Sequence, residues 1–61
     1  MPLIIVEALA GRTTEQKKGL AKDITEAVTK NFNVGPDAVT IIIHEFSEEN
    51  LAKGGKLKVD W

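Results

Sequence analysis

Pro2 is the first residue of the chain whose chemical type and position suggest catalysis. It follows Met1 and precedes an apolar run, Leu3 to Val6. Loss of the methionine would leave a secondary amine on a rigid ring, and an α-amino group titrates near ~7.7–8.0, within reach of a general base. If Met1 is retained, the Pro2 nitrogen is an amide and cannot act as a base. The structural alternative is that Pro2 only begins an edge strand, where its missing N–H does no harm.

Arg12 is the second candidate, because a guanidinium beside an amine favours the neutral amine and offers a fork to a carboxylate. The strand expected over residues 3–9 spans about 20 Å, so Arg12 cannot easily return to the Pro2 of its own chain. Arg12 of a neighbouring copy could do so. The alternative is a solvated arginine between a strand and a helix.

The elements that must position these residues follow from the apolar pattern. Leu3–Leu9 is rich in β-branched residues, with Glu7 as its one charged residue, which predicts a strand buried on both faces. A helix is expected to begin after Thr13, which can form a capping box with Gln16. Its apolar stripe at helical spacing runs from residue 20 to residue 32.

The second half of the chain begins with signals that end this helix. Asn33 or Gly35 can close it, and Pro36 prevents its continuation. Val39–Phe46 is apolar without alternation and predicts a second buried strand. After Gly54-Gly55, Lys56–Val59 alternates and predicts a short exposed strand or hairpin arm.

Strand, helix and strand of these lengths make a βαβ unit with parallel strands, an α/β (α+β) fold in a single domain over residues 1–61. Two strands are too few to stand alone. A chain of this size buries only about 60% of its unfolded surface. It has no cysteine for a disulfide or a zinc site, so a homo-oligomer is expected.

Composition excludes several classes of function. The net charge of −1 and the spread of the lysines argue against nucleic-acid binding. The apolar runs are too short to cross a bilayer, and no basic segment of a signal peptide precedes them. We therefore expect a soluble, cytoplasmic protein that interacts with neither nucleic acid nor membrane.

Four segments carry a family resemblance: Met1–Ile4, Ala10–Lys17 (Ala-Gly-Arg-Thr-Thr-Glu-Gln-Lys), Val39–Glu45 and Gly54-Gly55. In this order, over essentially the whole chain, they resemble the 4-oxalocrotonate tautomerase family. The resemblance implies β-α-β protomers with a short C-terminal hairpin arm, paired into four-stranded dimers and assembled as a hexamer (a trimer of dimers).

The same resemblance implies a tautomerase, an isomerase that moves a proton between carbon and oxygen in 2-hydroxy-dienoates or related 2-oxo acids. Pro2 would be the catalytic base and later the acid. Arg12 of a neighbouring subunit would bind a carboxylate of this small-molecule substrate. The resemblance implies no cofactor and no metal.

Two substitutions depart from the family pattern. The best-studied members have a second arginine where this chain has Thr40, and an aromatic residue where it has Leu51. Thr40 can donate one hydrogen bond but adds no charge to stabilise a developing enolate. We expect both residues to contact the substrate, with efficient action on a dicarboxylate dienol in doubt. Lys53 or Lys56 is a weaker candidate for the missing cation.

His44 is the only histidine, and it shares a strand face with Thr40. It is either a second acid–base group or a subunit-contact or partly exposed histidine, because a lone imidazole needs an orienting partner. Two further functions stay open. One is a non-catalytic oligomeric binding module of the same fold; the other is a proline-dependent dehalogenase or hydratase of unsaturated acids.

Overall fold

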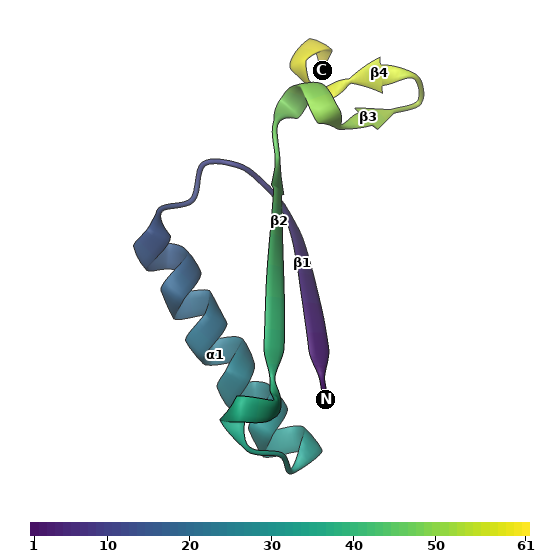
Figure 1. Cartoon of the computed structure of the whole chain (residues 1–61). Coiled ribbons are helices and arrows are strands. Elements are labelled where there is room, and N and C mark those ends of the chain that lie inside the picture. Colours follow the sequence, from purple (N-terminus) through teal and green to yellow (C-terminus); the bar gives the residue numbers. More distant parts are fainter.

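Two parallel strands joined by one long helix form the body of the protein. The computed structural model describes residues 1–61 and has β1 (Leu3–Leu9), α1 (Thr14–Phe32) and β2 (Thr40–Phe46) in this order (Figure 1). β1 and β2 pair in register from Leu3 opposite Thr40 to Leu9 opposite Phe46. The predicted β-α-β unit with parallel strands is confirmed.

The strand ends agree with the sequence prediction to within one residue. β1 has the expected bounds, whereas β2 begins at Thr40, one residue later than expected. A short 3₁₀ helix, η1 (Pro36–Ala38), precedes it, and the Val39 amide closes that turn on the Pro36 carbonyl at 3.1 Å. Val39 therefore serves as the cap of η1 and does not pair in the sheet.

Helix α1 begins and ends with the residues that the sequence indicated. The Thr13 hydroxyl accepts from the Gln16 amide at 3.1 Å, and the Gln16 side-chain oxygen accepts from the Thr13 amide at 2.9 Å. This is the predicted capping box. At the other end Asn33 adopts the left-handed conformation (φ 56°) that closes a helix. Of the two predicted closing residues, Asn33 ends α1, and Gly35 instead precedes η1.

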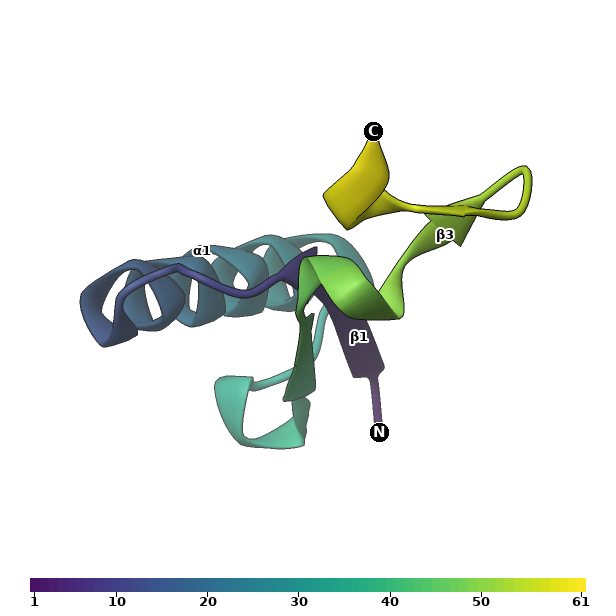
Figure 2. The ribbon, with the colours of Figure 1, turned by 90° about the horizontal axis from the view of Figure 1, so that it is seen from above.

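The helix covers only one face of the two-stranded sheet (Figure 2). Ile4 and Val6 on β1 and Ile43 on β2 are half-buried on the helix side. The alternate residues Leu3 and Ile5, on the opposite face, are 50% and 53% exposed. The predicted burial of both strand faces is therefore not achieved within one chain, in which no residue is fully buried.

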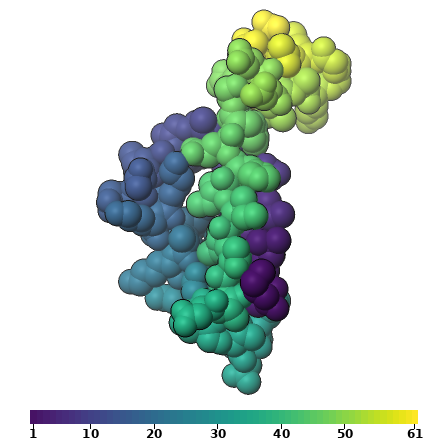
Figure 3. All heavy atoms as spheres, viewed as in Figure 1, coloured from purple at the N-terminus to yellow at the C-terminus, as the bar shows by residue number.

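The C-terminal segment forms the predicted hairpin arm. β3 (Ala52–Lys53) and β4 (Lys56–Leu57) pair antiparallel through Gly54-Gly55, whose φ values of 60° and 82° suit a tight two-residue hairpin turn. The strand expected over Lys56–Val59 is shorter, because the 3₁₀ helix η3 (Lys58–Asp60) begins at Lys58. The arm stands apart from the body of the chain (Figure 3).

The isolated chain is too extended to be a self-sufficient globule. Its radius of gyration is 14.9 Å, against about 10–11 Å for a compact chain of this length. Its accessible surface is 4740 Å², against about 3,900 Å² for a folded monomer of this mass. No helix combines the length and the apolar character that crossing a bilayer requires.

The capping box yields a first prediction. Thr13→Ala removes the hydroxyl that accepts from Gln16 and should lower the free energy of unfolding by about 1 kcal/mol. Urea unfolding at one fixed protein concentration, followed by helical circular dichroism, measures the change. Thr14→Ala, one residue further along and outside the capping box, is the matched control. Equal losses in the two variants would contradict the cap's contribution.

Candidate functional site

Pro2 and Thr40 lie side by side where the two strands begin. The Thr40 amide donates to the Pro2 carbonyl at 3.0 Å, which extends the sheet by one hydrogen bond. The Thr40 hydroxyl points toward the sulfur of Met1 at 3.7 Å. Pro2 is half-buried, whereas Met1 is 89% exposed. The candidate base and the residue in place of the family's second arginine are thus neighbours in one chain.

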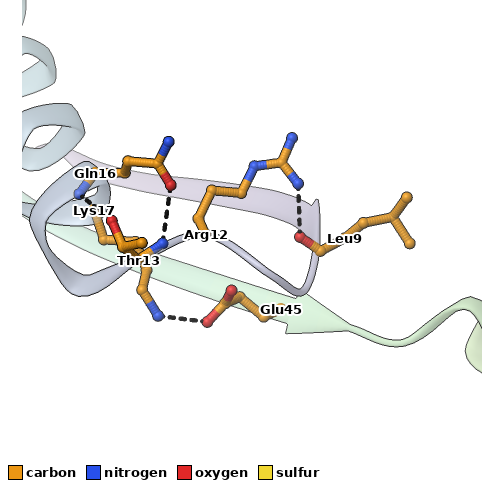
Figure 4. Close-up of polar contacts among 6 residues, drawn as sticks. All are labelled: Leu9, Arg12, Thr13, Gln16, Lys17 and Glu45. Carbon is orange, nitrogen blue, oxygen red and sulfur yellow. Dashed lines mark hydrogen bonds and ion pairs between the residues drawn. The ribbon is translucent and has the colours of Figure 1, made fainter.

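Arg12 lies at the opposite end of β1, in the loop that leads to α1. Gly11 has a φ of 123°, a value that residues with a side chain rarely adopt, so glycine lets the chain turn here. The Arg12 guanidinium donates from Nη1 to the Leu9 carbonyl at 3.1 Å and stays exposed (Figure 4). The capping box begins at the next residue, so Arg12 is held between the end of a strand and a capped helix.

A small hollow of about 60 Å³ lies between the sheet and the first half of α1, and Arg12 borders it. Its lining is mostly apolar, with three charged side chains: Val6, Ala8, Arg12, Lys17, Leu20, Ile43 and Glu45. Pro2 is not among them.

Lys17 and Glu45 form an ion pair across this hollow, with 2.6 Å between Nζ and Oε1 (Figure 4). The two side chains are 33% and 27% exposed, so the pair is largely shielded. The sequence patterns did not single out Glu45. A usable signal was its position two residues after Ile43, which places its carboxylate on the helix side, where it needs a cation.

Leu51 lies near the base of the hairpin arm. It is half-buried and caps the C-terminus of the 3₁₀ helix η2 (Glu48–Asn50). Its carbonyl accepts a hydrogen bond from the Lys58 amide at 2.8 Å. Lys53 and Lys56, the candidates for a missing cation, face each other across the hairpin as register partners. These residues follow β2, so they lie beyond the end of the sheet at which Arg12 lies (Figure 1).

The four predicted site residues therefore fall into two groups. Pro2 and Thr40 lie at one end of the sheet, and Arg12 and Leu51 lie toward the other. The seven residues of β1 between them span about 20 Å. One chain does not bring the four side chains together, and a site that contains all of them requires a second copy.

His44 has the partner that the sequence did not reveal. Its Nδ1 lies 3.3 Å from Oε2 of Glu7, its register partner on β1. The pair lies on the helix-free face of the sheet, on which Thr40 also lies. No three His, Cys, Asp or Glu side chains are close enough together to hold a metal ion.

Comparison with known proteins defines the class and then the family. The fold is that of solved 4-oxalocrotonate tautomerases. One, an isozyme from Methylibium petroleiphilum, superposes with a TM-score of 0.88 at 39% identity, covering 97% of this chain and 92% of that one. A heterohexameric 4-oxalocrotonate tautomerase from Chloroflexus aurantiacus gives a TM-score of 0.87 at 33% identity, covering 98% and 97%.

Sequence comparison agrees with the structures. A probable tautomerase from Bradyrhizobium diazoefficiens is 48% identical over 60 residues, which cover 98% of this chain and 90% of the relative. The family model described as "Tautomerase enzyme" matches residues 2–60. The chain belongs to the tautomerase family, as the sequence motifs predicted.

The shielded ion pair yields a second prediction. Lys17→Met, Glu45→Gln and the double variant form a cycle whose coupling free energy should be about 0.5–1 kcal/mol, reduced from a fully buried value by partial solvent screening. Urea unfolding of the four proteins at equal concentration gives the coupling. The same cycle on Glu15 and Lys18, 3.5 Å apart and highly exposed, is the control. A coupling no larger than in that control would contradict the assignment.

Proposed function

We propose that this chain is a tautomerase that interconverts the enol and keto forms of a 2-hydroxy-dienoate or related 2-oxo acid. The match to the tautomerase family over residues 2–60 carries the proposal. The exposed Met1 ahead of a half-buried Pro2 supports it, because removal of Met1 frees a secondary amine that is already partly desolvated. Pro2 is then the general base, and no cofactor takes part in this scheme.

The proposed reaction moves one proton. The lone pair of the Pro2 nitrogen takes the proton from the enol oxygen. The electron pair of the broken O–H bond stays on oxygen, and the resulting dienolate delocalises to form the carbonyl and a nucleophilic carbon. The protonated amine then delivers the proton to carbon, which completes the keto form and regenerates the base. No atom is gained or lost overall.

Three further residues serve this reaction in the proposal. Arg12 of a neighbouring copy holds a substrate carboxylate through its fork of N–H donors. Thr40, beside Pro2, donates one hydrogen bond to the oxygen on which charge develops. Leu51 provides an apolar wall.

We propose that the site is completed in a homo-oligomer, a hexamer built as a trimer of dimers. The separation of Pro2 from Arg12 along β1 supports this arrangement. So does the excess surface of the isolated chain, about 800 Å² above that of a compact monomer. The heterohexamer from Chloroflexus aurantiacus is a relative with six subunits. The cytoplasmic location and the single-domain organisation expected from the sequence stay predictions.

Replacement of the proline tests the enzymatic proposal. Pro2→Ala should lower kcat/KM for enol–keto conversion by about 10²-fold or more, because the positioned secondary amine is lost. Pro36→Ala, the only other proline, is the matched control and should keep its activity. Conversion is followed by ultraviolet absorbance, and intact mass after brief treatment with 3-bromopyruvate reports whether Met1 is absent and Pro2 carries the adduct.

Other outcomes of this experiment separate the alternatives. A wild-type protein without tautomerase activity, retaining Met1 or with an unreactive Pro2, would favour a non-catalytic binding module of the same fold. Activity toward halogenated or unsaturated acids that is lost in Pro2→Ala, with no tautomerisation, would favour the proline-dependent dehalogenase or hydratase.

Restoring a cation beside Pro2 tests the assignment of Thr40. Thr40→Arg should raise kcat/KM on a dicarboxylate dienol by about tenfold, since a hydrogen bond to a charged group contributes about 1.5–3 kcal/mol. Thr40→Gln adds length without charge and is the control. No gain with Thr40→Arg, in a variant that assembles as the wild type does, would show that position 40 does not contact the substrate.

A further inference from the structure

The helix-free face of the sheet carries one acid–base pair in an apolar setting. Glu7 and His44 are opposite each other in the strand register, with Oε2 and Nδ1 3.3 Å apart. Their side chains are 62% and 57% exposed in the isolated chain. The adjoining pair on the same face, Ile5 and Ile42, is 53% and 39% exposed.

A second copy of this chain is the occupant that fits this face. The excess surface of about 800 Å² is what one partner buries in a standard protein interface. The face is also self-complementary, because apolar side chains meet apolar side chains and each copy offers both a carboxylate and an imidazole. This step rests on the proposed homo-oligomer.

We propose that contact between copies encloses the Glu7–His44 pair and thereby couples assembly to the uptake of a proton. Above the titration range of histidine the exposed pair is a carboxylate beside a neutral imidazole, with a net charge of −1. Enclosure of that uncompensated charge is costly. A pair that holds one more proton is electrically neutral, whether the proton lies on the imidazole or is shared with the carboxylate. Enclosure therefore favours the neutral pair.

The direction of the pH effect follows from this balance. Because the assembled form holds more protons than the separated chains, assembly strengthens as pH falls from 8 to 6. It weakens again as pH falls toward 4, where carboxylates become protonated and the pair turns positive. The tightest assembly is therefore expected between these two ranges, with a change of up to about tenfold per pH unit for each proton bound.

Few other titratable groups face this pair. Glu45, the neighbour of His44 in sequence, lies on the opposite face with Lys17. The α-amino group lies beyond the start of β1, about 13 Å or more along the strand from Glu7. In the proposed self-complementary contact, the partner copy brings its own Glu7 and His44 to this face. On the helix-free face of one chain, these are the two titratable side chains to which we assign the pH response.

Sedimentation velocity at a series of dilutions, from pH 4.5 to 8.5 at constant ionic strength, tests the proposal. The wild-type protein should dissociate at several-fold higher concentration at pH 8 than at pH 6. Glu7→Gln/His44→Gln keeps a polar pair without titration and should assemble with little pH dependence. Glu26→Gln, on the exposed face of α1, is the control. It changes the net charge by the same amount as Glu7→Gln and should keep the wild-type pH profile.

A second measurement needs no variant. Dilution calorimetry of the wild-type protein at pH 7, in two buffers of different ionisation enthalpy, should show protons released on dissociation. Zero release, or a double variant with the wild-type pH profile, would overturn the proton coupling and leave the oligomer intact. A wild-type chain that remains monomeric at every pH and concentration would instead overturn the proposed assembly itself.

Discussion

Everything in this structure depends on one geometric constraint: a single helix can cover only one face of a two-stranded sheet. Both strands are apolar along their length, yet α1 shields only the side that carries Ile4, Val6 and Ile43. The other side keeps Leu3 and Ile5 half-exposed, and no residue in the chain is fully buried. Apolar burial is the main favourable term in folding, so the proposed oligomer would supply much of the stability that one chain of this size lacks. In that oligomer, folding and assembly are coupled.

The candidate site residues of one chain lie at opposite ends of strand β1. Its start holds Pro2 beside Thr40, and its finish leads into Gly11, Arg12 and the capping box. Local hydrogen bonds form at each end, from the Thr40 amide to the Pro2 carbonyl and within the capping box of α1. A strand of this length cannot bend back on itself, so it keeps Pro2 and the Arg12 guanidinium of one chain apart. The proposed site is complete only where the two ends of different copies meet, and the proposed activity is then a property of the assembly.

Local patterns in the sequence predicted most of the fold. The spacing of Thr13 and Gln16 indicated the start of α1, Asn33 or Gly35 its end, and the glycine pair the hairpin turn, because each feature depends on a few neighbouring residues. The adjacency of Pro2 and Thr40 required, in addition, the register of the two strands. The Lys17–Glu45 and Glu7–His44 pairs could not be predicted in the same way. They join residues 28 and 37 positions apart. The Glu7–His44 pair depends on the register of β1 against β2, and a one-residue slip would abolish it. The Lys17–Glu45 pair depends on how α1 packs against the sheet.

The two faces of this sheet carry different kinds of charged pair, Lys17–Glu45 on the helix side and Glu7–His44 on the helix-free side. On the helix side the carboxylate of Glu45 pairs with the ammonium group of Lys17. On the helix-free side Glu7 pairs with the imidazole of His44, the type of side chain whose charge changes near neutral pH. A lysine in place of His44 would keep the pair neutral at all physiological pH values and would remove any proton dependence of assembly. Because His44 lies on the face that copies are proposed to cover, the strength of the contact between copies would depend on pH. Because the proposed site needs two copies, such a contact would also make activity at low protein concentration depend on pH, independently of the titration of Pro2.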